Sequence, residues 1–448
     1  MGNVFPPSFF GMRGTGDWVD NQVPEDWNET ILYLFPNGDA PLTAMMAKMG
    51  TEPTDSTKVH WWTQGLPIQA ASITAGQIYT DAALAVAYVS GGVAGDHVYA
   101  KLGSETDVDH FREGHQITVR TATDLAGDVV TKCVERFKNG ASSYLKLKLL
   151  EADDNGTSTT MANATRVLVS GNMNAEGAAM PDAITYDPTE WYNNTHIFRT
   201  PLEITGTTIA IKLRTNPQAY LKMQKECLKT HSIEREKAFW FSVPTSGIGS
   251  NGKPERTMMG IIPAIRGTYA GHGGPAGTVS NYVNASAYAG KSWLAGGEDW
   301  LNAQLETIFL YGNVNKMAFC GNGALMAINR LVQNNGEFMW GPDTLVYGIK
   351  VREWITPLGS IALMTHPLFN YELTMRKAMV IIEPENVKRC PLKTRDTEFI
   401  AEEIGKTNSG YTRRDGIKEE YLTEETLELH HPIGWAFLEG FGDDNTAS

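Results

Sequence analysis

The sequence has few cysteines, and their spacing matches no metal or redox motif. Its four cysteines, Cys133, Cys227, Cys320 and Cys390, are far apart and include no CxxC pair. Zinc sites and redox motifs use closely spaced cysteines, so neither kind of site is supported. We therefore expect four reduced, buried thiols, as is usual for a cytosolic protein.

Segments that would cross or enter a membrane are also missing. No run of about 18 apolar residues, the length a transmembrane helix needs, occurs in the chain. The first residues, Met1-Gly2-Asn3-Val4-Phe5, contain no basic region followed by an apolar run, so they do not form a signal peptide. We expect no membrane partner.

Motifs for catalysis and cofactor binding are absent or out of context. Residues 247–252 (GIGSNG) match GxGxxG, but a dinucleotide site needs a strand before the motif and a helix after it. Here a helix is expected before it and Lys253-Pro254 follow, so we interpret the segment as a flexible loop. His110 and His115 have no third ligand at a plausible spacing and are expected in surface loops. We predict no catalytic, metal-binding or cofactor-binding residue, and no enzyme.

The charge argues against a protein that coats nucleic acid. The net charge is -13, whereas non-specific DNA binding needs Lys and Arg to neutralise phosphates. An excess of like charge instead keeps a concentrated subunit soluble and apart from its copies.

The N-terminal region is predicted to be an arm. Residues 1–30 are irregular and carry the apolar anchors Phe5, Phe9, Phe10, Trp18 and Trp27. Such a segment cannot fold alone and must bury its aromatic rings on the rest of the molecule or on a neighbour. A short helix is expected at 39–50.

Residues 53–170 follow with a strand at 58–63, a low-charge loop at 68–92 and alternating strands at 96–150. Alternation with period two indicates half-buried strands. The loop composition fits a projecting, adaptable segment, and the strands fit a small inserted β domain.

The second half mixes helices and strands, which predicts an α+β fold. Asn216 and Pro217 begin the strongest helix, at 216–242. A Gly-rich loop region is expected at 245–297, helices at 298–312 and 323–333, and strands at 316–320, 349–355, 360–364 and 378–382. From Glu398 onward 12 acidic residues face 4 basic ones, and the strands expected near 426–430 and 434–438 lie inside this acidic tail.

Several stretches resemble the major capsid proteins of tailed double-stranded DNA phages with the Hong Kong 97-type fold, in a branch with an enlarged extended loop. They are 174–177 (NAEG), 194–201 (NTHIFRTP), 204–207 (ITGT), 232–238 (SIEREKA), and 425–429 (ETLEL) with His431-Pro432 and Gly440-Phe441. His196 stands where Gln is usual. The likeness covers 30–62, 160–243 and 300–440 and is weak over 63–160.

This resemblance implies an order of domains. The N-terminal arm and short helix would be 1–52, and the extended loop with its inserted β domain 53–170. The peripheral domain would be 171–297 with spine helix 216–242, the axial domain 298–370, and the return strands and C-terminal tail 371–448.

The resemblance also implies a structural subunit that forms hexamers and pentamers of an icosahedral head around double-stranded DNA. Its partners would be copies of itself, a portal, a scaffolding protein and the packaged DNA, without sequence-specific contacts. We expect the scaffolding protein to be separate, because no long charged helical segment precedes the arm. The chain would lie in the virion capsid and, during assembly, in the host cytoplasm. Binding of decoration proteins to the inserted domain stays open.

Two alternatives remain. One is a shell protein of a cellular nanocompartment with the same fold, which would enclose enzymes instead of DNA. The other is a carbohydrate-active or receptor-binding β protein, since 11 tryptophans and 51 carboxylates can supply a sugar site with paired acids.

Five residues are candidates for contacts between subunits. Trp61 and Trp62 are expected at the base of the extended loop, near a contact between subunits. The alternative interpretation is that they pack in the strand core of one subunit. Glu176 is a candidate for an ion pair with a neighbour, and an ordinary exposed Glu is the alternative. Trp18 and Trp27 are the large aromatics of the arm.

Overall fold

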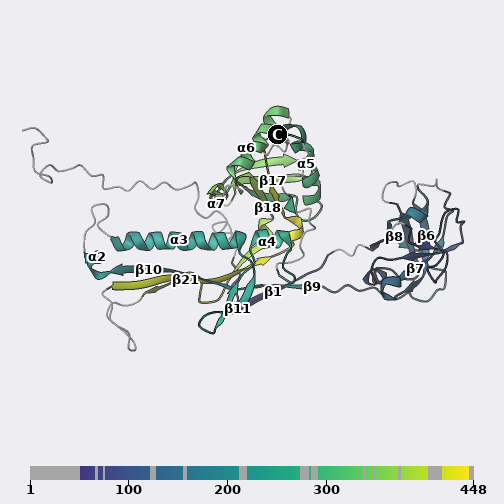
Figure 1. The fold of residues 1–448 in the computed structure, drawn as a ribbon, viewed down its shortest axis with the longest axis horizontal. Helices are drawn as coiled ribbons and strands as arrows, with labels where there is room; N and C mark the ends of the chain where they lie inside the picture. Colours follow the sequence, from purple (N-terminus) through teal and green to yellow (C-terminus); the bar gives the residue numbers. More distant parts are fainter. Residues whose placement is uncertain are drawn as a thin grey trace, which may run out of the picture. The chain divides into compact units, whose positions relative to one another are not determined.

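Two compact units make up the chain. One comprises Met1–Thr63 with Glu190–Ser448, and the other Gln64–Thr189. The computed structural model (Figure 1) describes residues 51–65, 69–73, 76–121, 128–154, 159–210, 219–272, 282–283, 291–335, 340–346, 349–371, 375–401 and 416–442. The expected arm, the short helix 39–50, Trp18 and Trp27 lie outside these residues.

A mixed seven-stranded sheet forms the centre of the first unit. Its strand order is β13-β22-β18-β14-β17-β16-β15. The strands are β13 (Tyr282–Val283), β22 (Ala436–Glu439), β18 (Ala378–Ile382), β14 (Asn315–Cys320), β17 (Gly359–Thr365), β16 (Ile349–Thr356) and β15 (Trp340–Val346). The central pair β14–β17 is parallel, while β14–β18 is antiparallel.

Both faces of this sheet are covered, so its central strands are apolar on both sides. Along β14, Met317 and Phe319 enter one core, and Ala318 and Cys320 enter the other. Helices α5 (Trp293–Ile308) and α6 (Asn322–Asn335) cover one face. The last turn of α3 (Ala219–Phe241) and α4 (Ile261–Arg266) cover the other.

A four-stranded sheet continues the first unit. It consists of β10 (His196–Thr205), β21 (Gly416–Leu429), β19 (Val387–Pro391) and β20 (Glu398–Ala401). Helix α3 lies along β10 and β21 (Figure 1). Residues of β10 alternate between buried and exposed from Phe198 to Thr205, as expected for a strand with one face under a helix.

Shorter elements complete the first unit. Strand β1 (Lys58–Thr63) pairs with β9 (Thr189–Asn194), and β11 (Thr245–Ile248) forms a hairpin with β12 (Pro254–Thr257). Helices α2 (Gly206–Ala210) and α7 (Pro367–Tyr371) are single turns. No described helix has the length and apolar character needed to cross a membrane.

The second unit is a seven-stranded antiparallel sheet of order β2-β8-β5-β6-β7-β4-β3. Its core contains Phe111, Ile117, Leu147 and Val167, and all residues of that core come from this unit. The strands are β2 (Ala70–Ser72), β3 (Ile78–Tyr79), β4 (His97–Lys101), β5 (His115–Arg120), β6 (Val129–Phe137), β7 (Tyr144–Leu149) and β8 (Arg166–Asn172).

Most expected elements agree with the structure. Strand 58–63 is β1, the helix predicted at 216–242 is α3, and the helix predicted at 323–333 is α6. All four cysteines are free and buried, as predicted. The α+β fold class is confirmed by this mixture of helices and strands.

Three expectations were wrong. The supposed loop 245–297 contains the β11–β12 hairpin, α4 and the start of α5, and the supposed loop 68–92 contains β2 and β3. Within the acidic tail, the strands expected near 426–430 and 434–438 correspond to the end of β21 and to β22, and Glu425 and Thr426 are fully buried. His115 is also buried, at 3% exposure, because β5 carries it into the second unit.

Candidate functional site

Strand β1 places its two tryptophans on opposite faces. Successive side chains of a strand alternate, and Trp61 is 5% exposed whereas Trp62 is 61% exposed. Trp61 packs in the first unit's core with Phe198 and Leu429. The burial of Trp61 agrees with the alternative interpretation, strand core within one subunit, and the contact role stays a proposal that Trp62 supports best.

The outer face of the β1–β9 pair is polar and aromatic. Lys58 Nζ lies 4.7 Å from the ring centroid of Tyr192, and the rings of His60 and His272 lie 5.7 and 4.2 Å from it. His60 Nδ1 is 2.7 Å from a carboxylate oxygen of Glu190. Together with Trp62 on the same strand face, these groups form a surface suited to another protein.

Glu176 lies in an exposed, irregular stretch of the second unit. Among the described residues it has no ion-pair partner. A neighbouring subunit's Arg or Lys is thus the partner that its proposed role requires. Trp18 and Trp27 lie outside the described residues, so their contact roles also stay proposals.

A buried charge cluster fixes helix α3 to the sheet beneath it. Arg235 Nε and Nη2 donate to the two carboxylate oxygens of Glu425, at 2.6 and 2.9 Å. Arg389 of β19 donates to the same carboxylate and to Asp396. Paired guanidinium groups around one carboxylate offset the cost of burying it, so three elements are held in one arrangement.

His231, one turn before Arg235, extends this cluster with neutral hydrogen bonds. Its ring nitrogens lie 2.9 Å from Thr200 Oγ1 of β10 and 2.8 Å from Thr423 Oγ1 of β21. Burial, followed by the positive charge of Arg235, lowers the pKa of His231 to about 4. The imidazole is therefore neutral near pH 7 and ties the helix to both strands.

A second buried pair joins the start of the central strand β14 to the residue after the neighbouring strand β18. Lys316 Nζ donates to Glu383, to the Tyr311 carbonyl at 3.1 Å and to the Gly434 carbonyl at 2.9 Å. Burial lowers the pKa of Lys316, and Glu383 opposes that shift. Three acceptors match the three donors of an ammonium group, so the pair has the geometry of a structural anchor.

The sequence did not point to these charged residues. Charged side chains are rarely buried unless paired, and the partners of Glu383 and Glu425 lie far from them in the sequence. The sequence held one indication of a buried polar group on α3. Cys227, His231 and Arg235 are spaced four residues apart, so polar side chains lie on the same helix face as apolar ones. This spacing alone does not indicate a function.

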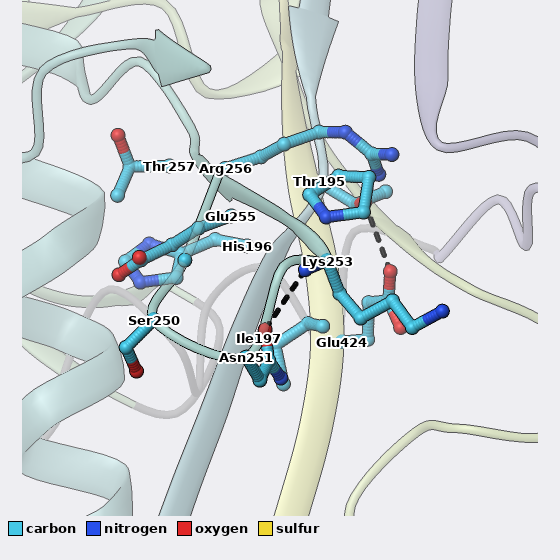
Figure 2. Close-up of a pocket in the computed structure, with 12 residues that line it drawn as sticks. Thr195, His196, Ile197, Ser250, Asn251, Lys253, Glu255, Arg256, Thr257 and Glu424 are labelled. Atoms are coloured by element: carbon cyan, nitrogen blue, oxygen red, sulfur yellow. Dashed lines mark hydrogen bonds between the residues drawn. The ribbon is translucent and has the colours of Figure 1, made fainter. Parts of the chain in front are cut away.

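A surface pocket of about 270 Å³ lies between the β11–β12 hairpin and the β10–β21 pair (Figure 2). Thr195 Oγ1 donates to Glu424 at 3.0 Å, and the Lys253 N–H donates to Asn251 Oδ1 at 3.0 Å. Its lining mixes Lys253 and Arg256 with Glu255 and Glu424.

The GxGxxG segment spans the end of β11 and the turn of that hairpin. Strand β12 follows it, so it lacks the helix that a dinucleotide fingerprint needs. Among the described residues no group of three His, Cys, Asp or Glu side chains is placed to hold a metal ion.

The chain was compared with known protein families. It matches the family described as SU10 major capsid protein over residues 11–442. The chain belongs to the SU10 major capsid protein family. The prediction of a phage major capsid protein is thereby confirmed, and this member of the SU10 family is a structural component of the virion capsid.

A curated relative is also similar to the chain. It is the major capsid protein of Pseudomonas phage PaMx41, which is 24% identical over 423 residues, covering 92% of this chain and 91% of the relative.

Solved structures with some likeness were also found. One, from Mycobacterium phage Cain, has a TM-score of 0.42 and 9% identity, and the match covers 94% of this chain and 93% of that chain. The capsid of a native GTA particle has a TM-score of 0.42 and 8% identity, with 93% and 95% covered. The holo-SrpI encapsulin complex of Synechococcus elongatus PCC 7942 has a TM-score of 0.35 and 12% identity, with 57% and 76% covered. The SU10 assignment rests on the family match alone.

Proposed function

We propose that this SU10-family subunit assembles with copies of itself into hexamers and pentamers, which close an icosahedral head around double-stranded DNA. The family match across residues 11–442 carries the proposal. The protein acts by assembly and performs no catalysis. Its fold is of the Hong Kong 97 type.

The domain assignment follows the same proposal. Residues 1–52 are the arm, 53–170 the extended loop, 171–297 the peripheral domain, 298–370 the axial domain and 371–448 the return strands and tail. Helix α3 along β10 and β21 suits a spine helix, and α5 and α6 on the central sheet suit an axial domain.

Contacts between subunits involve Trp62, Glu176, Trp18 and Trp27 in this proposal. Trp62 has the strongest support, because a large aromatic that is 61% exposed loses much apolar surface to water when it docks. Tryptophan is also enriched among residues that dominate interface energies.

The other partners are a portal, a scaffolding protein and the enclosed DNA. A net charge of -13 suits a shell wall that encloses DNA without binding it tightly. Assembly takes place in the host cytoplasm before the head becomes part of the virion.

Electron microscopy tests the proposal. The full chain is expressed alone and together with the other head proteins of its phage. We expect closed heads of uniform size containing DNA in the second case, and irregular assemblies in the first. Discrete monomers under every condition would overturn the shell function. Uniform shells from the lone chain would overturn the need for scaffolding, and shells filled with enzyme would support a nanocompartment.

A further inference from the structure

Two arginines lie side by side on the outer face of the second unit's sheet. Arg120 of β5 is the register partner of Arg166 of β8, and Ser72 of β2 pairs with Arg166 on its other side. The next register pair, Val119 and Val167, is fully buried. Because the side chains of a strand alternate, the two arginines project away from the core.

These arginines line a surface pocket of about 570 Å³. Its lining is completed by Ala70, Ala71, Ser72, Thr121 and Thr165. Among these described lining residues there is no Asp or Glu. Guanidinium groups beside hydroxyl groups are hydrogen-bond donors that a carboxylate can accept, so the pocket has the chemistry of a carboxylate site.

Only one of the two arginines has an anionic partner in the described chain. Arg120 donates through Nε and Nη2 to the two carboxylate oxygens of Asp128, at 2.9 and 2.6 Å. Arg166 forms no ion pair and no side-chain hydrogen bond with any described residue. Like charges directly opposite one another on neighbouring strands destabilise a sheet. A second carboxylate beside Arg166 would offset the charge that Asp128 leaves uncompensated.

The N-terminal arm contains a segment that matches this pocket. Residues 17–29 (DWVDNQVPEDWNE) contain five carboxylates, and the sequence has no Lys or Arg from residue 14 to residue 47. Asp17 directly precedes Trp18, and Asp26 directly precedes Trp27. A guanidinium binds a carboxylate through two hydrogen bonds and also stacks on an indole ring. An Asp–Trp pair therefore matches an unpaired arginine more fully than a carboxylate alone.

Strand β21 is also strongly acidic, but its glutamates already have partners. Side chains of the first unit bind Glu419, Glu420, Glu424, Glu425 and Glu428. These carboxylates could bind another subunit only by breaking contacts within their own. The arm is therefore the acidic segment that the charge of the pocket selects.

The arm is long enough to reach a neighbour. Thr51 forms a bridge with Arg389 in the first unit, so this end of the arm is attached there. Residues 30–50 can span up to about 70 Å when fully extended. This reach is about twice the axial length of a 23-residue helix such as α3, which allows residues 17–29 to contact a second subunit.

We propose that the pocket around Arg166 binds an Asp–Trp pair, Asp17-Trp18 or Asp26-Trp27, from the arm of a neighbouring copy. The inference rests on the proposed shell function. It gives the arm a specific site on the inserted unit of the next subunit. The carboxylate pairs with Arg166, and the indole covers the guanidinium.

Cysteine cross-linking in assembled heads tests the inference. Ser72→Cys places a thiol in the pocket, and Val19→Cys or Asn28→Cys places one beside either arm tryptophan without removing a carboxylate. The four native cysteines are buried. Purified heads of each double variant of the full chain are treated with a short bismaleimide and run on a denaturing gel. The control replaces Ser72→Cys by Ser142→Cys, an exposed serine after the far end of β6.

We expect dimers and longer chains of the capsid protein, several-fold more with Ser72→Cys than with Ser142→Cys. Adding Arg166→Gln should remove most of this excess, whereas adding Lys148→Gln, at an exposed cation of β7 outside the pocket, should leave it unchanged.

The unassembled full chain supplies a check on folding. Arg166→Gln should leave the urea midpoint unchanged or raise it, because the change removes one of two opposed like charges. A lowered midpoint would show that Arg166 stabilises its own sheet and would contradict a site kept for a neighbour.

Three results with intact heads would overturn the inference and leave the shell function standing. They are no excess over the control, a cross-link from the pocket to a different head protein, and a cross-link within one subunit, seen as a monomer of altered mobility. Absence of heads from the unmodified chain with its head proteins would instead contradict the shell function.

Discussion

Arg235 of α3 and Glu425 of β21 form two buried hydrogen bonds, although they are 190 residues apart in the sequence. Glu425 is fully buried and Arg235 is 8% exposed. A buried pair of this kind adds little stability over apolar packing, but loss of one partner leaves an uncompensated charge. The pair therefore fixes the position of helix α3 on strand β21.

Replacing Arg235 by Met should strongly destabilise the chain. Glu425 would keep only Arg389, so we expect the free energy of unfolding to fall by about 3–5 kcal/mol. Urea unfolding of the unassembled full chain measures this change. The matched control is Arg199→Met, since Arg199 pairs with Glu420 on the same strand but is 61% exposed in its side chain.

The control should lose only about 0–1 kcal/mol, because water screens exposed pairs. Equal losses in both variants would show that burial of the Arg235 pair has no special importance.

Lowering the pH should reduce the free energy of unfolding, partly through His231. Its pKa is about 4 in the folded protein and 6.5 as the ordinary value, so the unfolded chain binds more protons between these values. Stability contributed by the neutral imidazole is full above pH 6.5 and falls as the pH drops toward 4.

His231→Gln should flatten that part of the pH dependence. The measurement is the urea midpoint from pH 7 to pH 4 in both proteins, with His60→Gln as a control at an exposed histidine. If wild type and His231→Gln lose stability in parallel, the imidazole does not contribute to the acid response.

Alternation and helical spacing in the sequence correctly predicted one strand and the long helix. The 58–63 strand alternates in burial, and α3 carries Cys227 and His231 four residues apart on its buried side. The start of α5 was missed because Gly296 and Gly297 interrupt the helical pattern. Packing requires Gly297, since a Cβ there would lie 2.5 Å from the Trp293 ring.

The buried charged pairs could not be predicted from the sequence, for a different reason. A carboxylate on a strand reads as solvent-facing unless its partner is known. The partner of Glu425 is 190 residues away, and Lys316 is 67 residues before Glu383. Only the tertiary fold brings them together.

The Lys316–Glu383 anchor should show strong coupling between its partners. Lys316→Met leaves Glu383 buried without its cation, and we expect a loss of about 3–5 kcal/mol. The double variant Lys316→Met/Glu383→Gln removes the unpaired charge while keeping an acceptor for the Asn313 N–H, which lies 3.1 Å from Glu383.

The double variant should therefore be more stable than Lys316→Met alone, as measured by urea unfolding. A double variant at least as unstable as the single one would show that the cost comes from lost packing instead of the buried charge.

Trp61 and Trp62 are neighbours with opposite expected effects. Trp61→Ala empties part of the core and should lower the free energy of unfolding by about 3–5 kcal/mol. Trp62→Ala removes a side chain that is 61% exposed, so the unassembled chain should lose less than about 1 kcal/mol of unfolding free energy.

If Trp62 contacts a neighbour, the loss appears on assembly, because truncation of a central interface tryptophan costs about 2 kcal/mol or more per contact. Sedimentation of heads against free subunits, measured beside urea unfolding, separates the two effects. If Trp62→Ala gives the same yield of heads as the wild type, Trp62 does not contribute to the contact between subunits.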